Sequence, residues 1–189
     1  PAPQPQLLPG QVKLKNINGD DKLNEEDMVL IGRNDPKFIF GFNNNFSYKN
    51  FDLNIYMYGQ VGKIAGANSY YDAWGSYGNR IKLGQNVPVS FKDAWSSDNQ
   101  TSTRPSFIES AYGTGDLFLQ KISFLRIRNI TLGYTVPISK SICNRLRVYA
   151  DINNPCVWTN WKGQDPETDS NTNAYPNVTS FSIGVDISF

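Results

Sequence analysis

Oxygen-bearing side chains recur at alternate positions in one short stretch near the start of the chain, NINGDDKLNEED. Calcium is bound by hard oxygen ligands, and a tight loop turns alternate side chains inward toward a single ion. In that register the ligands would be Asn16, Asn18, Asp20, the carbonyl of Lys22 and Asp27. The sequence therefore predicts a calcium site in this segment, and it requires no other cofactor.

This EF-hand-like segment departs from the usual ligand pattern at two positions. Asn16 stands where the first ligand is normally an acid, and Asp21 stands where the turn normally has a glycine. Because Asp tolerates the left-handed backbone conformation better than most residues, the loop shape can survive this change. The alternative is an Asx-rich turn that holds itself by hydrogen bonds between its side chains and its own backbone.

Catalytic chemistry has little support in the sequence. No histidine occurs, which excludes Ser-His-Asp and Cys-His nucleophilic catalysis and His-ligated zinc. The acids Asp165, Glu167 and Asp169 show no arrangement that indicates general acid–base chemistry. Cys143 and Cys156 flank a predicted strand, whose length exceeds the ~7 Å that a disulfide can span. We therefore expect neither enzyme activity nor a disulfide.

Composition narrows the class of protein further. The length of 189 residues suits one ordinary domain, and the net charge of +1 gives no reason to expect nucleic acid as a partner. No stretch approaches the ~18 consecutive apolar residues of a transmembrane helix, and no signal peptide opens the chain. The start, PAPQPQLLPG, is typical of an extended connector. We expect the chain to be a piece of a longer one.

Alternation of apolar and polar residues extends through much of the chain and indicates β-strands. In segments 38–48 and 51–61 the two apolar sets share one face if Lys49 and Asn50 form the turn. The same pattern predicts strands in KISFLRIRNITLGYTVP, RLRVYADIN and FSIGVDISF. The apolar set changes face near Arg128 and Asn129, which predicts a β-bulge there.

Long and short connections alternate between these strands, with long polar loops at about 62–118 and 154–177. Bacterial outer-membrane barrels have long loops outside and tight turns at the periplasmic side. We therefore predict an all-β fold, a sector of an antiparallel transmembrane β-barrel with about five strands. Residues 1–37 would form an extracellular loop that contains the EF-hand-like segment, and residues 38–189 would form the barrel strands.

So few strands cannot close a barrel, and unpaired backbone is not tolerated in lipid. The barrel would therefore be completed by sequence outside this chain or by another chain. A soluble sandwich gives similar alternation, so the alternative is a secreted β-sandwich module that binds a ligand and carries the calcium loop. Solubility without detergent would separate the two.

Specific motifs carry a family resemblance. The stretch LPGQVKLKNINGDDKLNEEDMVLIGRNDPKFIFGFNNNFSYKNFDLNIYMYGQVG resembles the late barrel region of SusC/RagA-type TonB-dependent outer-membrane transporters. Further pieces are similar in the same order: SFLRIRNITLGYTVP, LRVYADINN, GQDPET, YPN and a final SIGVDISF. The resemblance covers nearly the whole chain from Pro9, and the loop at 62–118 is its least typical part.

The resemblance implies a barrel of about 22 strands with an N-terminal plug, energised by TonB and covered by a SusD-like surface lipoprotein. Such pairs import oligosaccharides or peptides across the outer membrane in Bacteroidetes. This chain would be the C-terminal part of the barrel, in contact with the lipid bilayer, the remaining barrel and the plug. The resemblance also implies that Phe189 belongs to the signal that the barrel-assembly machinery reads.

Two groups of side chains are candidates for contacts with these partners. The long loops contain aromatic residues that could stack on sugar rings or peptide side chains, contact the lid protein, or pack on one another: Tyr70, Tyr71, Trp74, Trp95, Trp158 and Trp161. A second group alternates with apolar residues and should face the lumen, pairing with one another or with the plug: Asp52, Arg126, Arg128, Arg147 and Asp151.

Overall fold

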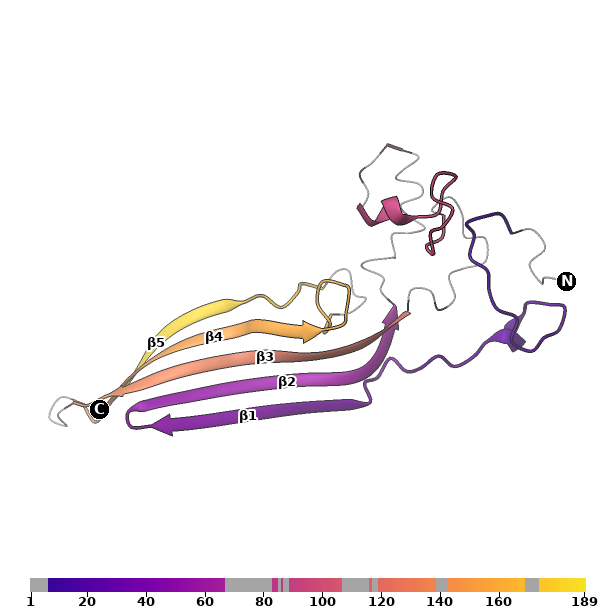
Figure 1. The fold of residues 1–189 in the computed structure, drawn as a ribbon. Coiled ribbons are helices and arrows are strands. Elements are labelled where there is room, and N and C mark those ends of the chain that lie inside the picture. The colour runs from indigo at the N-terminus through magenta and orange to yellow at the C-terminus, as the bar shows by residue number, and fades with distance from the viewer. Residues whose placement is uncertain are drawn as a thin grey trace. The chain divides into compact units, whose positions relative to one another are not determined.

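The computed structural model describes residues 7–66, 83–84, 86, 89–106, 116, 119–138, 143–168 and 174–189. Within these residues, five strands form one sheet in the order of the chain (Figure 1). They are β1 (Phe38–Tyr48), β2 (Phe51–Gly66), β3 (Leu119–Val136), β4 (Arg145–Thr159) and β5 (Ser180–Ser188). The short 3₁₀ helices η1 (Glu25–Asp27) and η2 (Val89–Asp93) lie outside the sheet. The predicted all-β fold is confirmed.

The hairpin between β1 and β2 closes in the predicted register. Tyr48 pairs with Phe51, and Phe38 pairs with Val61 at the far end of the ladder. Lys49 adopts a φ of 55°, the positive value that tight two-residue hairpin turns favour. The alternating pattern and the turn therefore agree on the same pairing.

Strands β3 and β4 pair antiparallel with one register shift between Ile127 and Asn129. This is the β-bulge that the change of apolar face predicted. Strands β4 and β5 also pair antiparallel, with Ile152 of β4 opposite Phe181 of β5. The bulge lets apolar residues on both sides of it occupy one continuous face.

Two strands are longer than the sequence pattern predicted. β2 continues to Gly66 and β4 continues to Thr159, although the long loops were expected from about 62 and 154. Gly62 and Asn154 have positive φ angles, 84° and 50°. These residues disturb the alternation without ending the strand, so the pattern alone placed the loop boundaries too early.

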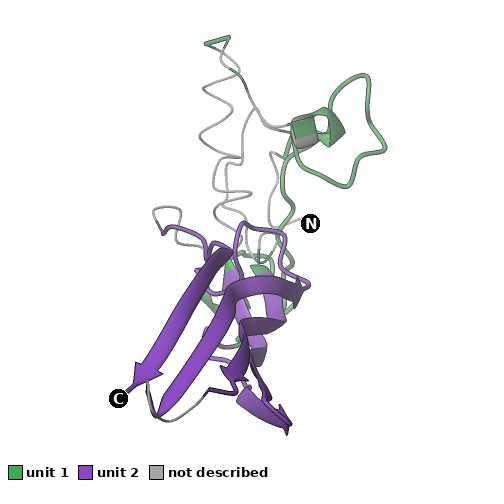
Figure 2. Ribbon diagram, turned by 90° about the vertical axis from the view of Figure 1, so that its left-hand side faces the viewer, with its two compact units in different colours: residues 1–32, 66–119 green, residues 33–65, 120–189 purple. Residues whose placement is uncertain are grey.

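The chain divides into two compact units, which Figure 2 distinguishes by colour. One comprises residues 1–32 and 66–119, and the other comprises residues 33–65 and 120–189. The division expected at residue 37, between an extracellular loop and the barrel strands, stays a prediction. Residues 33–37 belong with the sheet because the Lys37 N–H donates to the Val61 carbonyl and the Ile64 N–H to the Arg33 carbonyl, each over 2.8 Å.

The sheet has two contrasting faces. On the apolar face, large side chains of β1 and β5 stand open: Phe42 is 55% exposed, Phe46 57%, Phe181 75% and Ile183 84%. An exposed apolar surface of this extent marks a region that contacts lipid or another protein. On the polar face, side chains contact one another across strands. Among the described residues, no helix combines the length and the apolar character needed to cross a membrane.

Candidate functional site

One ion-pair network joins three strands, β2, β4 and β5, across the polar face. Arg147 of β4 donates from Nε and Nη2 to both carboxylate oxygens of Asp52 on β2, over 2.9 Å and 2.6 Å. Its Nη1 donates to Asp186 of β5 over 3.1 Å. The guanidinium crosses β3 at Gly133, where a Cβ would overlap it. Of the charged residues predicted to face the lumen, Asp52 and Arg147 are thus brought together.

Further side-chain hydrogen bonds continue along the same face. The Asn54 side-chain amide donates to Asn43 and Asn45 of β1, each over 2.6 Å. The Thr131 hydroxyl of β3 donates to Asp151 of β4. Because each contact links neighbouring strands through side chains, the polar face is a connected hydrogen-bonding surface.

An aromatic residue covers a glycine between β4 and β5. Tyr149 lies directly opposite Gly184, and a Cβ added to Gly184 would overlap the tyrosine ring. The guanidinium of Arg147 lies 5.1 Å from the centre of that ring, within the range of a cation–π interaction. Ring, glycine and guanidinium therefore form one packed group beside the ion-pair network.

A second, more deeply buried network lies beyond the bulge. Arg126, which is 2% exposed, donates from Nη2 to Asp165 over 2.8 Å. Nη2 of Arg128 lies 3.0 Å from an oxygen of Glu167. Asn177 donates to both acids, over 3.2 Å to Asp165 and 2.7 Å to Glu167. The two arginines of β3 thus hold the connection that leaves β4.

The electrostatics of Asp165 are set by several donors. Burial favours its neutral form, but the backbone N–H groups of Glu167 and Asn177 and the charge of Arg126 outweigh that effect and hold the pKa of Asp165 below its usual value. The carboxylate is therefore ionised at neutral pH, as a buried ion pair requires.

Sequence reasoning treated Asp165 and Glu167 as loop acids, and it did not include Asp186 or Asn177 among the candidate site residues. A signal was present, because the first two acids flank the proline of GQDPET and Asn177 ends YPN, both motifs of the family resemblance. Their partners lie far away in sequence, since Asp165 is 39 positions after Arg126. Local pattern does not identify such pairs.

The candidate aromatic residues have different environments. Trp161 is only 6% exposed, and its indole lies against Gly163, so it packs within its own segment. Trp158 lies in β4 rather than in a loop, opposite Leu125 on the apolar side of β3, and it is 56% exposed. Tyr70, Tyr71 and Trp74 lie outside the described residues.

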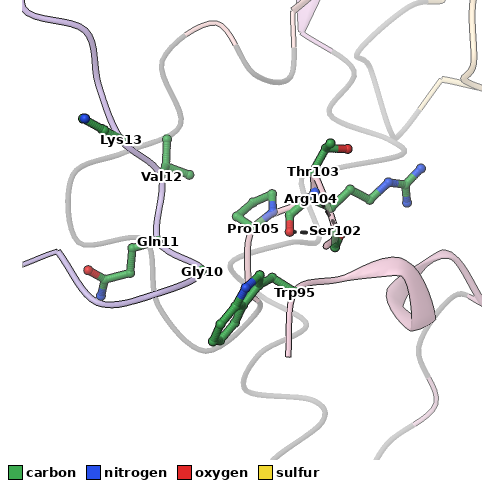
Figure 3. Close-up of a pocket in the computed structure, with 9 residues that line it drawn as sticks. All are labelled: Gly10, Gln11, Val12, Lys13, Trp95, Ser102, Thr103, Arg104 and Pro105. Carbon is green, nitrogen blue, oxygen red and sulfur yellow. Dashed lines mark hydrogen bonds between the residues drawn. The ribbon is translucent and has the colours of Figure 1, made fainter. Parts of the chain in front are cut away.

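Trp95 lines a hollow of about 350 Å³ (Figure 3). Its ring lies against Gly10, which has a φ of 86° and no room for a Cβ. The two segments are joined by a 2.7 Å hydrogen bond from the Ser106 N–H to the Gly10 carbonyl. In Figure 3 the side chain of Lys13 points away from the indole. One indole face therefore packs within the unit.

The predicted calcium segment folds as a series of Asx turns. The Asn16 side-chain oxygen accepts from the Gly19 N–H over 2.6 Å, and that of Asn18 accepts from the Asp20 N–H over 3.0 Å. Asp20 in turn accepts from the Lys22 N–H over 2.8 Å. The turns bring the predicted ligands into one short loop, which agrees with either interpretation of the sequence.

Asp27 closes this loop. Its carboxylate accepts backbone N–H groups from Ile17 over 2.7 Å and Asn24 over 3.1 Å, and those hydrogen bonds lower its pKa, with Ile17 the larger cause. Within the described residues, no three His, Cys, Asp or Glu side chains gather as they would around a metal ion. A calcium site here would therefore need amide and carbonyl oxygens besides the carboxylates of Asp20 and Asp27, and calcium binding stays a prediction.

The cysteines and Phe189 can also be placed. Cys143 is buried and Cys156 is partly buried, and both are free thiols, which confirms that they do not pair. Phe189 follows the end of β5 and is 86% exposed. Its role in assembly stays a prediction.

Comparison with known proteins gives this geometry a context. No family profile matches the chain. It is 28% identical to TonB-dependent receptor P3 of Formosa agariphila across 96% of its length, and 26% identical to TonB-dependent receptor SusC of Bacteroides thetaiotaomicron across 91%. The solved structure of the RagAB peptide transporter matches 96% of the chain with a TM-score of 0.72 and 26% identity. Over nearly its whole length, the chain is similar to SusC/RagA-type TonB-dependent receptors.

The chain spans only part of the length of such proteins, 19% of receptor P3 and 20% of the matched RagAB chain. The similarity to these receptors and the β-sheet fold agree with the predicted location in the outer membrane. The matched proteins are named as receptors and a transporter, which agrees with the expectation that the chain is not an enzyme. The fold of the chain is thus that of one sector of a β-barrel.

Proposed function

We propose that this chain forms the C-terminal part of the barrel wall in an importer of oligosaccharides or peptides. In this proposal the complete receptor contains a plug, draws energy from TonB through an N-terminal region outside this chain, and is covered by a SusD-like surface lipoprotein. The chain contributes wall, lumen surface and extracellular loops, and no catalytic step.

The contrast between the two faces of the sheet carries the proposal. The exposed apolar side chains of β1 and β5 suit hydrocarbon, whereas the opposite face carries ion pairs and amide contacts that suit a wet interior. On this basis the lumen-facing set is Asp52, Arg126, Arg128, Arg147 and Asp151. Arg147 illustrates the fit, because an arginine bonded to two carboxylates on lipid-facing positions would be costly.

The alternative of a soluble β-sandwich has weaker support. A sandwich buries the apolar face of one sheet against a second sheet, and the described part of the chain contains a single sheet whose apolar face is exposed. If the intact receptor remained monodisperse in buffer without detergent, the barrel proposal would fail.

The imported substrate could belong to either of two chemical classes, peptides or oligosaccharides. The RagAB structure is that of a peptide transporter, whereas the resemblance to the SusC/RagA type as a whole implies oligosaccharides or peptides. The lumen face offers amides, carboxylates and guanidinium groups, which can hydrogen-bond either class. Both classes should therefore be tested in parallel.

The experiment uses the complete receptor, expressed with its neighbouring lipoprotein in cells that lack their own copies. Uptake of a fluorescent pool of short oligosaccharides and of a fluorescent pool of short peptides is measured with and without functional TonB. We expect TonB-dependent uptake of one pool. Receptor-containing cells that take up neither pool faster than receptor-free cells would contradict the proposal.

A further inference from the structure

The connection after β4, described at residues 160–168 and 174–179, folds back over the polar face of the sheet. Arg126 and Phe124 lie on the side of β3 that carries the ring of Tyr58 from β2, since the Phe124 and Tyr58 ring centres are 5.7 Å apart. Tyr58 alternates with Asn54 and Asp52, which make the polar-face contacts described above. Because Arg126 bonds Asp165, the connection lies on this face.

Burial on this face is concentrated under the connection. Ile122 and Phe124 of β3 are 0% and 4% exposed, and Trp161 of the connection is 6% exposed. Pro166, beside Asp165, is also fully buried. The connection therefore packs as an apolar layer against this end of the polar face, and it does not simply project from the end of the sheet.

Hydrogen bonds to the β3 backbone fix where the connection begins. The side chain of Asn160 donates to the Lys121 carbonyl over 2.8 Å and accepts from the Ser123 N–H over 2.9 Å. The Thr159 hydroxyl donates to the Ser123 carbonyl over 3.0 Å. These contacts turn the chain over β3 at the point where β4 ends.

Two carboxylates then hold the folded connection in place. Asp165 receives Arg126 and the N–H of Asn177, and Glu167 receives Arg128. The guanidinium of Arg128 also lies 5.9 Å from the centre of the Tyr58 ring. Both ends of the connection are thereby attached to the polar face, the first through residues 160–168 and the second through Asn177.

We propose that residues 160–168 and 174–179 form an inward-folded constriction of the transport path, held by Arg126 and Arg128 through Asp165 and Glu167. This inference rests on the proposed function, because a constriction matters only if solute moves along the polar face. The four side chains hold the constriction in place, and the constriction limits the size of the solute that can pass on this side of the barrel.

Accessibility of a reporter thiol tests the constriction without a substrate. Ser182 of β5 pairs with Asp151 on the polar face, closer to the β3–β4 turn than the carboxylate cluster. In the complete receptor, Ser182→Cys is introduced after the native cysteines, among them Cys143 and Cys156, are replaced by serine. Intact cells are then treated with a small maleimide or a bulky polyethylene-glycol maleimide.

The test variant combines Asp165→Asn with Glu167→Gln. Removing one partner of a buried ion pair is strongly destabilising, so we expect the bulky reagent to label about tenfold faster or more, with a smaller change for the small reagent. The matched control, Asp98→Asn with Glu25→Gln, removes the same charge at exposed positions and should label like the parent receptor.

Two outcomes would overturn the inference. One is equal labelling of the cluster variant and the parent with both reagents, and the other is an equal increase in the control. If the double variant fails to reach the outer membrane, Glu167→Gln alone leaves the Arg126–Asp165 pair intact and should give a smaller increase in the same direction. Labelling needs no import, so failure of the constriction and failure of the proposed function would be seen separately.

Discussion

Arg147 on β4 reaches across β3 to Asp52 on β2, with its Nη2 2.6 Å from a carboxylate oxygen. The two strands are not neighbours in the sheet. The contact is possible because β3 presents Gly133 at the crossing point, where any side chain would meet the guanidinium. A single glycine therefore permits an ion pair that links strands on either side of it.

Substitution of Gly133 should break this link. A Cβ in Gly133→Ala would overlap Arg147 and lie 2.5 Å from Oδ1 of Asp52, so we expect a loss of about 1–3 kcal/mol in stability, as for other overpacked sites. Gly41→Ala is the matched control, since its Cβ would lie 3.5 Å from the nearest atom. The measurement is the unfolding midpoint of the complete receptor, which is followed through the heat-dependent change in its mobility on gels. Equal midpoints for the two variants would refute the role of Gly133.

The packing of Tyr149 on Gly184 predicts a coupled pair of substitutions. Gly184→Ala should destabilise the receptor because its Cβ would overlap the tyrosine ring, and the cost should fall when Tyr149→Ser removes the ring. Residues in contact commonly show coupling of about 0.5–3 kcal/mol in such double-mutant cycles. Additive effects on the unfolding midpoint would show that the ring and the glycine act independently.

Asp165 should make the constriction sensitive to acid, with a definite sign. Its pKa is lowered in the folded state, so its contribution is fully present above the unfolded value of ~3.9 and is lost as pH falls through the lower folded value. We expect amide hydrogen exchange of residues 160–168, corrected for intrinsic rates, to stay constant from about pH 7 to 5 and to rise only below about pH 4. A rise between neutral pH and pH 5 would contradict this assignment.

The loop from Asn16 to Asp27 should bind calcium weakly. Extracellular calcium modules of this kind have dissociation constants of about 10⁻⁴–10⁻³ M, a range accessible to calorimetry on the complete receptor in detergent. Asp20→Asn removes a ligand charge but retains an oxygen that can accept the Lys22 N–H, so binding should weaken while the turn survives. Asp98→Asn serves as the control. If the parent receptor produces no calcium-dependent heat, the loop is an Asx-rich turn alone.

Local pattern predicted the features that are themselves local. The β1–β2 hairpin follows from alternation on both sides of Lys49 and Asn50, and the bulge follows from the change of apolar face near Asn129. In each case the deciding residues lie within one strand or one turn. The physical cause is the period of two residues in a strand, which a sequence displays directly.

The cross-strand networks could not be predicted in the same way. Alternation places Arg126 and Arg147 on the polar face, but it does not say which distant carboxylate each will meet. Asp165 reaches Arg126 only because the connection turns back over β3, and Asp52 reaches Arg147 only because Gly133 lies between them. Those outcomes depend on the register of several strands at once.

The single sheet has one more consequence. In the described part of the chain, β1 and β5 are the outermost strands, each with one edge of the sheet beyond it. Their N–H and C=O groups offer a template on which further chains can add, and the apolar face favours stacking. Produced alone, this segment should aggregate through its edges, so folding studies on it would measure fibre-like association in place of the receptor's own assembly.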